Sequence, residues 1–232
     1  MKHSIRFFFL GLCSLMVFAS CNGVGGDATA NEIVIGEYGS LTGGQATFGT
    51  STRDGIDIAV EEINKSGGVL GKKIRVIVED DQGRPEEAQT VVTKLITKDK
   101  VVAVLGEVAS SNSIAAAPVA QQYGIPMISP SSTNPEVTRK GDYIFRVCFL
   151  DPFQGYVMAK FVADTLKLTK VAVLRDIKND YSIGLADAFI ENFKKKGGAI
   201  VSDESYSAGD TDFNAQLTAT KAKSPQAIFV PG

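Results

Sequence analysis

Short apolar runs alternate with helical patterns along most of the chain. In the helical segments the apolar residues recur at i, i+3, i+4 and i+7, which is the spacing of one helical face. Pro85, followed by two acidic residues, opens the second of these segments, as expected at a helix N-terminus. The predicted inner face of the first helix consists of Ile56, Ala59, Val60 and Ile63, and that of a later one of Leu185, Phe189 and Phe193.

The apolar runs between these helices predict eight strands. The run 101–105 is continuously apolar, which is typical of a strand buried on both faces of a parallel sheet. Two series of strand and helix, joined near 149–151, predict an α/β protein with two doubly wound parallel-sheet lobes, at 32–148 and 149–232. Pro118 lies inside one helical pattern and predicts a kink or a break there. The predicted strands are 33–37, 74–79, 101–105, 125–128, 143–147, 171–174, 199–206 and 227–230.

The N-terminal segment predicts a signal peptide and not a part of the fold. Basic residues precede the apolar run 7–18, which is short for a membrane span. Small residues then precede Cys21, as in a bacterial lipoprotein signal, so we expect cleavage of 1–20 and lipidation of Cys21. Ordinary secretory cleavage nearby is the alternative. The glycine-rich segment 21–31 is predicted to be a tether.

Composition excludes several functional classes. The 232 residues carry a net charge of −2, which gives no support to nucleic-acid binding. The only histidine is His3, so the processed chain would lack any Ser-His-Asp triad, Cys-His dyad or His-ligated metal. We therefore expect no enzymatic activity, no metal and no cofactor. Besides Cys21, the processed chain keeps only Cys148, which predicts no internal disulfide and a small apolar core residue.

Two acidic residues after a predicted strand raise the question of a metal or acid–base site. Asp80 and Asp81 directly follow Glu79, which belongs to the predicted strand itself, and no histidine stands near them in the sequence. Short acidic side chains in loops commonly accept hydrogen bonds from neighbouring backbone N–H groups. The pair is therefore interpreted as stabilising its loop.

Two polar clusters, ASSNS and SPSSTNP, follow two consecutive predicted strands. In open parallel sheets, ligands bind at the carboxyl ends of the strands. ASSNS opens a helix whose free N–H groups attract a carboxylate, whereas carbonyls of SPSSTNP can accept from an ammonium and Thr133 can donate and accept. The two turns together suit an α-amino acid. The alternative is that Ser111 or Asn112 merely caps the helix, and that Asn134 and Pro135 merely form a turn.

Seven segments, in order, resemble the periplasmic leucine/isoleucine/valine-binding proteins, the branched-chain amino acid substrate-binding components of ABC importers. The resemblance spans 33–232. It implies a non-enzymatic protein with the two-lobed periplasmic binding protein type I fold, also called a Venus-flytrap, that captures an amino acid by hinge closure and delivers it to an ABC permease in the inner membrane. The segments are SLTGGQATFG, EEINKSGGVLGKKI, VEDDQGRPEEA, ISPSSTNPEVT, FRVCFLDPFQG, VAVLRD with YSIGLADAF, and AGDTDFNAQL.

The same resemblance implies roles for five residues. Ser110 matches the serine whose hydroxyl and N–H hold the ligand carboxylate, and Thr133 the threonine that contributes both its N–H and its hydroxyl. Ser131 occupies the position whose backbone carbonyl accepts from the ammonium. Tyr181 matches a second-lobe tyrosine that faces the ligand, and Phe48 an aromatic that covers the ligand side chain. For these two aromatic residues the alternative role is simple packing.

This sequence departs from the family pattern in two ways. The cysteine pair of some members is missing, and the sequence ends at VPG, before further second-lobe contacts, a later acidic residue and the return to the first lobe. We therefore expect both lobes to be incomplete, with marginal solubility and weak ligand binding. The expected location is the periplasm or cell surface, lipid-anchored to the membrane. The alternative function is a ligand-sensing module for amides, urea or other amino acids that acts through a receptor.

Overall fold

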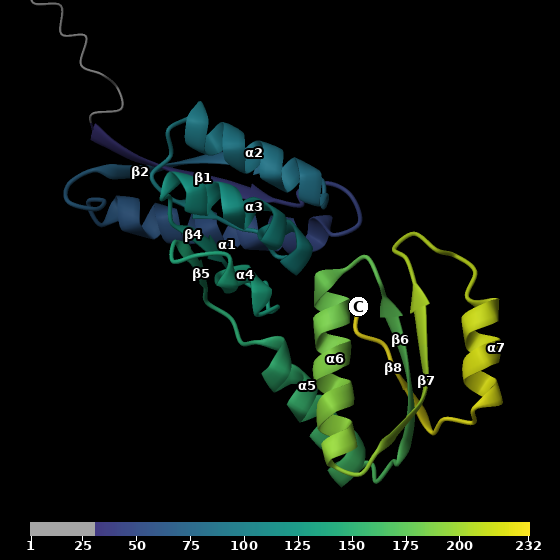
Figure 1. Ribbon diagram of the computed structural model, residues 1–232. Helices are drawn as coiled ribbons and strands as arrows, with labels where there is room; N and C mark the ends of the chain where they lie inside the picture. The colour runs from purple at the N-terminus through teal and green to yellow at the C-terminus, as the bar shows by residue number, and fades with distance from the viewer. Residues whose placement is uncertain (1–30) are drawn as a thin grey trace, which may run out of the picture.

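The computed structural model describes residues 31–232, which form two parallel β-sheets with helices packed on them (Figure 1). The predicted signal peptide and the lipidation of Cys21 lie outside the described residues, as does nearly all of the predicted tether. The first sheet has the strand order β2-β1-β3-β4-β5. Its strands are β1 (Glu32–Gly39), β2 (Lys73–Asp80), β3 (Val104–Leu105), β4 (Met127–Ser129) and β5 (Ile144–Arg146).

Four helices accompany the first sheet. Pro85 is the first residue of α2 and needs no hydrogen-bond acceptor there, and the predicted acidic first turn is present. Pro118 lies inside α3 without splitting it, so a break at this position was a wrong prediction. The helices are α1 (Ala46–Lys65), α2 (Pro85–Thr97), α3 (Ser110–Tyr123) and the short α4 (Glu136–Arg139).

The two faces of the first sheet pack differently, because successive side chains of a strand point to opposite faces. One face packs against α2 and α3, and its strand residues are buried in a continuous apolar core, as are Val92 and Leu95 of α2. The other face adjoins α1 and forms an apolar groove. The core-facing strand residues are Val34, Val104, Met127 and Ile144, and the groove-facing ones are Ile35, Leu105 and Ile128.

Three predictions about the first lobe were wrong. The run 101–105 forms only the two-residue strand β3, and Val102 is 55% exposed, because the face opposite α2 and α3 lacks a full cover. Gly49 is the only fully buried residue of α1, and its predicted inner face lines the apolar groove instead of packing into a core. Cys148 is half-buried, and its thiol lies 3.5 Å from the Ser132 carbonyl oxygen instead of in a core.

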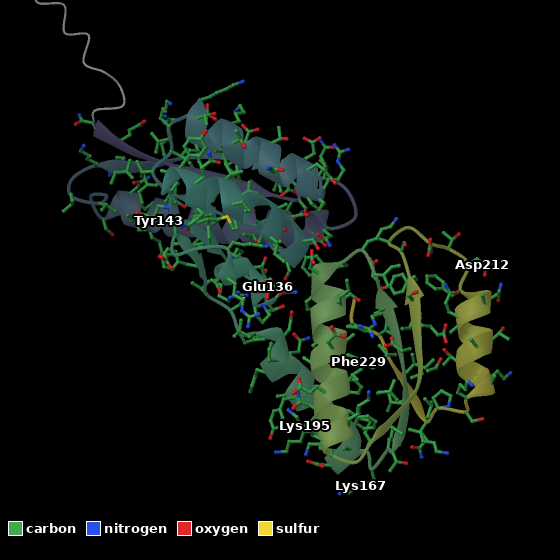
Figure 2. The ribbon with its side chains drawn as sticks, in the orientation of Figure 1. Glu136, Tyr143, Lys167, Lys195, Asp212 and Phe229 are labelled. Atoms are coloured by element: carbon green, nitrogen blue, oxygen red, sulfur yellow. The ribbon has the colours of Figure 1, made fainter. Side chains whose placement is uncertain are left out.

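The second sheet has the strand order β7-β6-β8 and its own aromatic core. Phe189 is fully buried and stacks on Phe193 and on Phe229, with ring centroids 5.4 and 4.1 Å apart. Phe229, which is labelled in Figure 2, comes from β8. This confirms the predicted inner face of helix α6 (Asp180–Lys195), which consists of Leu185, Phe189 and Phe193. The elements are α5 (Asp151–Lys160), a π-helical turn (Phe161–Thr165), β6 (Lys170–Asp176), α6 (Asp180–Lys195), β7 (Ala199–Tyr206), α7 (Asn214–Ala222) and β8 (Ala227–Phe229).

The described chain passes from the first sheet to the second between β5 and α5 (Figure 1). A Cβ on Gly155 of α5 would lie 2.6 Å from that of Ala188 in α6, so the glycine permits the close packing of these two helices. The N-terminus of α6 contacts the first lobe through the turns that follow β3 and β4. Of the helices in residues 31–232, none has both the length and the apolar character that a membrane crossing requires.

Candidate functional site

A pocket of about 400 Å³ lies where the turns of the two sheets meet, and the five predicted ligand-binding residues all line it. The volume is within the range of small-molecule sites, about 300–1,000 Å³. None of the lining side chains is charged. The lining residues are Gln45, Phe48, Val108, Ala109, Ser110, Ser131, Thr133, Phe149, Gln154, Asn179, Tyr181 and Gly232.

The turn after β3 presents an open helix N-terminus to this pocket. Ala109 is the N-cap of α3, and no side chain caps the helix, so the proposed cap at Ser111 or Asn112 was wrong. Ser110 is the first residue of the helix and is 2% exposed. Its Oγ accepts a hydrogen bond from the Asn134 N–H at 3.2 Å, and its own proton has no acceptor among residues 31–232. The turn can therefore donate a hydroxyl and backbone N–H groups to an anionic ligand group.

The buried side chain of Glu107 stabilises the turn after β3 by hydrogen bonds. Glu107 accepts hydrogen bonds from the Ser40 N–H at 2.9 Å, from the Ser40 hydroxyl at 2.6 Å and from the Ala109 N–H. Its backbone carbonyl accepts from the hydroxyls of Ser129 and Ser132, at 2.7 and 2.9 Å. The turns after β3 and β4 are therefore fixed to each other by hydrogen bonds.

The acidic pair after β2 stabilises its loop, as predicted. Asp80 accepts from the backbone N–H groups of Leu41 and Gln82, at 3.0 and 2.8 Å. Burial alone would raise its pKa, but the hydrogen bond from the Thr42 hydroxyl and these backbone bonds outweigh it and hold the pKa below the usual value. Asp81 is fully buried and accepts from the Gly83 N–H at 2.9 Å. Burial raises the pKa of Asp81 to about 7.

The turn after β4 is held by an arginine from the neighbouring strand. Arg146 donates to the carbonyl oxygens of Ser132 and Asn134, the residues on either side of Thr133, at 2.5 and 2.8 Å. It also donates to the Thr138 hydroxyl at 3.0 Å. These bonds fix the backbone that carries Thr133, which is 6% exposed and faces the pocket. Asn134 does shape a turn here, as the alternative interpretation held, because its side-chain oxygen accepts from the Glu136 N–H at 2.8 Å.

The second lobe contributes the start of α6. Asn179 caps this helix by accepting from the N–H groups of Tyr181 and Ser182, at 3.0 and 3.4 Å. Tyr181 is half-buried, and its hydroxyl accepts from the Gln154 side chain at 3.2 Å. Phe48, from α1, is 62% exposed and borders the pocket from the first lobe. Two aromatic residues therefore border the same space from different lobes.

Two polar groups near the pocket had no part in the predicted site. The Asp151 carboxyl is completely buried, and neither of its oxygens has a hydrogen-bond partner among the described residues. Its backbone N–H donates to the Thr133 carbonyl at 3.0 Å, and burial raises the pKa of its carboxyl while first the Thr133 side chain and then Arg146 oppose that shift. Gln45 lines the pocket, and its side-chain oxygen is also buried without a partner within residues 31–232.

The uncharged polar groups of the pocket are suited to binding a small ligand. No group of three His, Cys, Asp or Glu residues in 31–232 is placed to hold a metal ion. The hydroxyls and backbone groups of the pocket can hold a zwitterion, with its anionic end at α3 and its cationic end near the turn after β4. The exposed rings of Phe48 and Phe149 provide an apolar surface against which a ligand side chain can pack.

Comparison with known proteins assigns the chain to a family. A model of the periplasmic binding proteins matches residues 32–231, nearly the whole described chain. The chain belongs to the periplasmic binding protein family. Members of this family are binding proteins and not enzymes, in agreement with the expectation from the sequence.

Three relatives show how much of a periplasmic binding protein this chain represents. It is 38% identical, over 99% of its length, to an amino acid binding protein of Pseudomonas aeruginosa, of which it covers 61%. It is 42% identical, over 87% of its length, to the substrate-binding protein of a branched-chain amino acid transporter from Streptococcus pneumoniae, solved with isoleucine, and covers 57% of that chain at a TM-score of 0.79. The chain is also 30% identical, over 86% of its length, to a solute-binding protein from Rhodopseudomonas palustris that was solved with 3,4-dihydroxybenzoic acid. It covers 54% of that protein, and the TM-score is 0.75.

The periplasmic binding protein fold was predictable here, and so was the grouping of the five residues around one space. Gln45 stands within SLTGGQATFG, and Asp151 and Gln154 within FRVCFLDPFQG, two of the segments that carried the resemblance. Their positions in recognisable segments were the available signal. Spacing alone could not show that the Asp151 carboxyl is buried without a partner, because that depends on how α5 approaches the first lobe.

Proposed function

We propose that this chain forms the ligand-binding part of an extracytoplasmic solute-binding protein of an ABC importer, and that its ligand is a branched-chain amino acid. The observation that carries the proposal is the convergence of Ser110, Ser131, Thr133, Tyr181 and Phe48 on one uncharged pocket at the open N-terminus of α3. The relatives named for amino acid binding, and the isoleucine complex among them, support the choice of ligand class.

In the proposed mode of binding, the carboxylate of the ligand lies at the N-terminus of α3. It accepts from the Ser110 hydroxyl and N–H and from the hydroxyl and N–H of Thr133. The ammonium donates to the Ser131 carbonyl, and the Asp151 carboxyl lies next to Thr133 on the far side of the turn. The ligand side chain lies against Phe48, with Tyr181 facing it from the second lobe.

The two lobes are proposed to be 32–148 and 149–232, with closure around 149–151. The boundary is supported by the separate cores of the two sheets. Ligand-driven closure requires that the ligand bind the closed arrangement better than the open one. The pocket offers this difference, because Tyr181 and Asn179 come from the second lobe and Ser110 and Thr133 from the first.

The proposal is tested by calorimetry and thermal unfolding of the 232-residue chain with L-leucine and L-isoleucine. The sequence alone predicts weak binding, but the five site residues line one pocket, so we expect both ligands to raise the melting temperature. A ligand that binds only the native state stabilises it by mass action. Ser110→Ala and Thr133→Ala are each expected to weaken binding by about 1.5–3 kcal/mol, the range for a charge-assisted hydrogen bond.

A matched control and a competing ligand make this test specific. Ser51→Ala, on the exposed surface of α1, removes a hydroxyl that bonds only within its own helix and should leave affinity unchanged. An aromatic acid such as 3,4-dihydroxybenzoate is the second probe, because a 30% identical relative was solved with it. Binding of the aromatic acid without any response to leucine or isoleucine would contradict the proposed ligand class.

The proposal includes a lipid anchor at Cys21 and an ABC permease as partner. Small residues before Cys21 and the preceding apolar run support lipidation. In cells, Cys21→Ser should abolish incorporation of labelled fatty acid and release the protein from the membrane fraction. Cys148→Ser is the matched control and should keep the label. A wild-type protein that takes no label would exclude the anchor and leave the binding proposal standing.

A further inference from the structure

Two first-lobe side chains hold the same stretch of second-lobe backbone. The Ser111 hydroxyl accepts a hydrogen bond from the Asp180 N–H at 2.9 Å, and the Asn134 side-chain amide donates to the Asp180 carbonyl at 2.7 Å. Ser111 follows Ser110 in the chain, Asn134 follows Thr133, and Asp180 precedes Tyr181. Each contact is therefore made by the immediate neighbour of a proposed ligand-binding residue.

The helix end at Asp180 needs the partner that Ser111 supplies. The first N–H groups of an α-helix have no acceptor within the helix. Asn179 satisfies the N–H groups of Tyr181 and Ser182, whereas the N–H of Asp180, the first residue of α6, is satisfied across the lobes by Ser111. The N-terminal cap of α6 is thus shared between the two lobes.

The geometry of Asn134 directs its amide across the cleft. Its side-chain oxygen accepts from the Glu136 N–H at 2.8 Å, so the amide nitrogen is the group left to reach Asp180. Asn134 is 7% exposed. On the opposing helix, a Cβ added to Gly184 would lie 2.9 Å from the Asn134 amide nitrogen. The absence of a side chain at Gly184 is therefore what lets α6 approach the turn after β4 this closely.

We propose that Ser111 and Asn134 are positioning residues that form an inter-lobe latch on Asp180, and that this latch holds Tyr181 opposite the α3 turn. The inference rests on the proposed function only for its effect on ligand affinity. The latch exists only when the lobes are together, so it favours the closed arrangement with or without ligand and lowers the cost of closure on binding. It touches no part of the ligand itself.

The latch is tested first without ligand, by hydrogen exchange of the Asp180 amide in the 232-residue chain. This amide has no acceptor in its own helix, so its protection reports the Ser111 contact directly. In Ser111→Ala we expect exchange about tenfold faster at Asp180, with α6 amides beyond its first turn unchanged. Ser111→Thr keeps a hydroxyl and should restore most of the protection. Equal exchange in wild type and Ser111→Ala would overturn the proposal.

Ligand affinity supplies the second measurement, with L-leucine as the probe. Ser111→Ala and Asn134→Asp should each weaken binding about 3- to 10-fold, as expected for loss of one hydrogen bond that is not made to the ligand. Asn134→Asp keeps the acceptor for the Glu136 N–H and removes the donor across the lobes, but it also adds a negative charge, so Ser111→Ala is the charge-neutral test of the same latch. Unchanged affinity in both variants of a leucine-binding protein would overturn the positioning role.

Gly184→Ala separates the latch from a general effect on stability. Alanine in a helix interior is more favourable than glycine, so α6 should become more stable. The added methyl group would nevertheless crowd the Asn134 amide, so the Asp180 amide should exchange faster and leucine should bind more weakly. Tighter binding together with slower exchange would contradict the latch. If wild type does not respond to leucine at all, the proposed function fails, whereas the exchange measurements still test the latch.

Discussion

The two faces of the first sheet carry similar apolar residues but differ in how fully they are covered. On the face beneath α2 and α3, Val104 and Met127 are completely buried. On the opposite face Phe145 of β5 is 47% exposed, and Val147, just beyond that strand, is 77% exposed. The ligand-binding turns are anchored from the covered face, because Arg146 alternates with Phe145 along β5 and therefore points to the same side as Ile144.

This difference shows that the site and the uncovered groove are separable parts of one sheet. The turns after β3 and β4 are fixed by Glu107 and Arg146, whose partners all belong to the first lobe. The groove beside α1 makes none of these hydrogen bonds. We therefore expect changes on the covered face to alter stability or the site strongly, and changes in the groove to alter neither to a comparable degree.

The largest expected difference between the faces is in core stability. Leu95→Ala, in the completely buried part of α2, should lower the free energy of unfolding by about 2–5 kcal/mol, because it removes buried carbon atoms and leaves a cavity. Ile63→Ala, on the groove side of α1 and 38% exposed, should cost less than about 1 kcal/mol. Urea denaturation measures both. Equal losses would mean that the groove is packed as tightly as the core.

Removal of the arginine that supports the turn after β4 should have the next largest effect. Arg146→Met leaves the carbonyl oxygens of Ser132 and Asn134 without their donor, and should weaken leucine binding by about 2–3 kcal/mol through the displacement of Thr133. Arg146→Lys supplies one ammonium group in place of the planar guanidinium and should recover only part of the lost affinity. Calorimetry on both variants tests this, and full affinity in Arg146→Met would show that the turn needs no support from β5.

A buried acid on the groove side should make stability depend on pH. Burial raises the pKa of Glu37 to about 7, although Arg53 lies 3.5 Å away and opposes the shift. Because the folded-state pKa is above the usual value of 4.5, the folded state binds the proton more tightly. The contribution of Glu37 to stability is therefore fully present below about pH 4.5 and is lost as the pH rises through about 7.

The variant Glu37→Gln removes this dependence. At pH 8 it should be more stable than wild type by about 1–2 kcal/mol, and at pH 4 the two proteins should be nearly equal. Asp81, whose pKa burial also raises to about 7, continues to titrate in the variant, so the profile flattens without becoming level. Denaturation midpoints across this pH range provide the measurement. Glu61→Gln, on the exposed surface of α1, is the control, and an unchanged Glu37→Gln profile would contradict the prediction.

The smallest expected effect concerns the most exposed apolar residue next to the groove. Val147→Thr should change the free energy of unfolding by no more than about 0.5 kcal/mol, because the side chain is 77% exposed. It should reduce concentration-dependent association, since it adds a polar group to an exposed apolar surface. Sedimentation of the wild type and the variant compares them. A large loss of stability would show that Val147 is packed in solution.

Periodicity and strand-end chemistry were sufficient to predict the α/β class, the two series of elements and the two polar turns. They failed where coverage by another element decides the outcome, as at Val102 and along α1. They also could not place Ser111 and Asn134 against Asp180, because that contact joins residues far apart in sequence through the approach of α6. Local sequence patterns indicate which helix or strand a residue belongs to. Its burial and its inter-lobe contacts depend instead on which other elements pack against it.

The strand order also constrains how the chain can fold. β1 is an interior strand of its sheet, with β2 on one side and β3 on the other, and its Gly36 pairs with Val104. β6 is central in the same way, with Val171 paired to Ala227. Every such pairing is parallel and must wait for a helical crossover, so native contacts form mainly between distant segments and folding is expected to be slow. During synthesis, β1 and β6 each keep one edge unpaired until the third strand of their sheet has emerged.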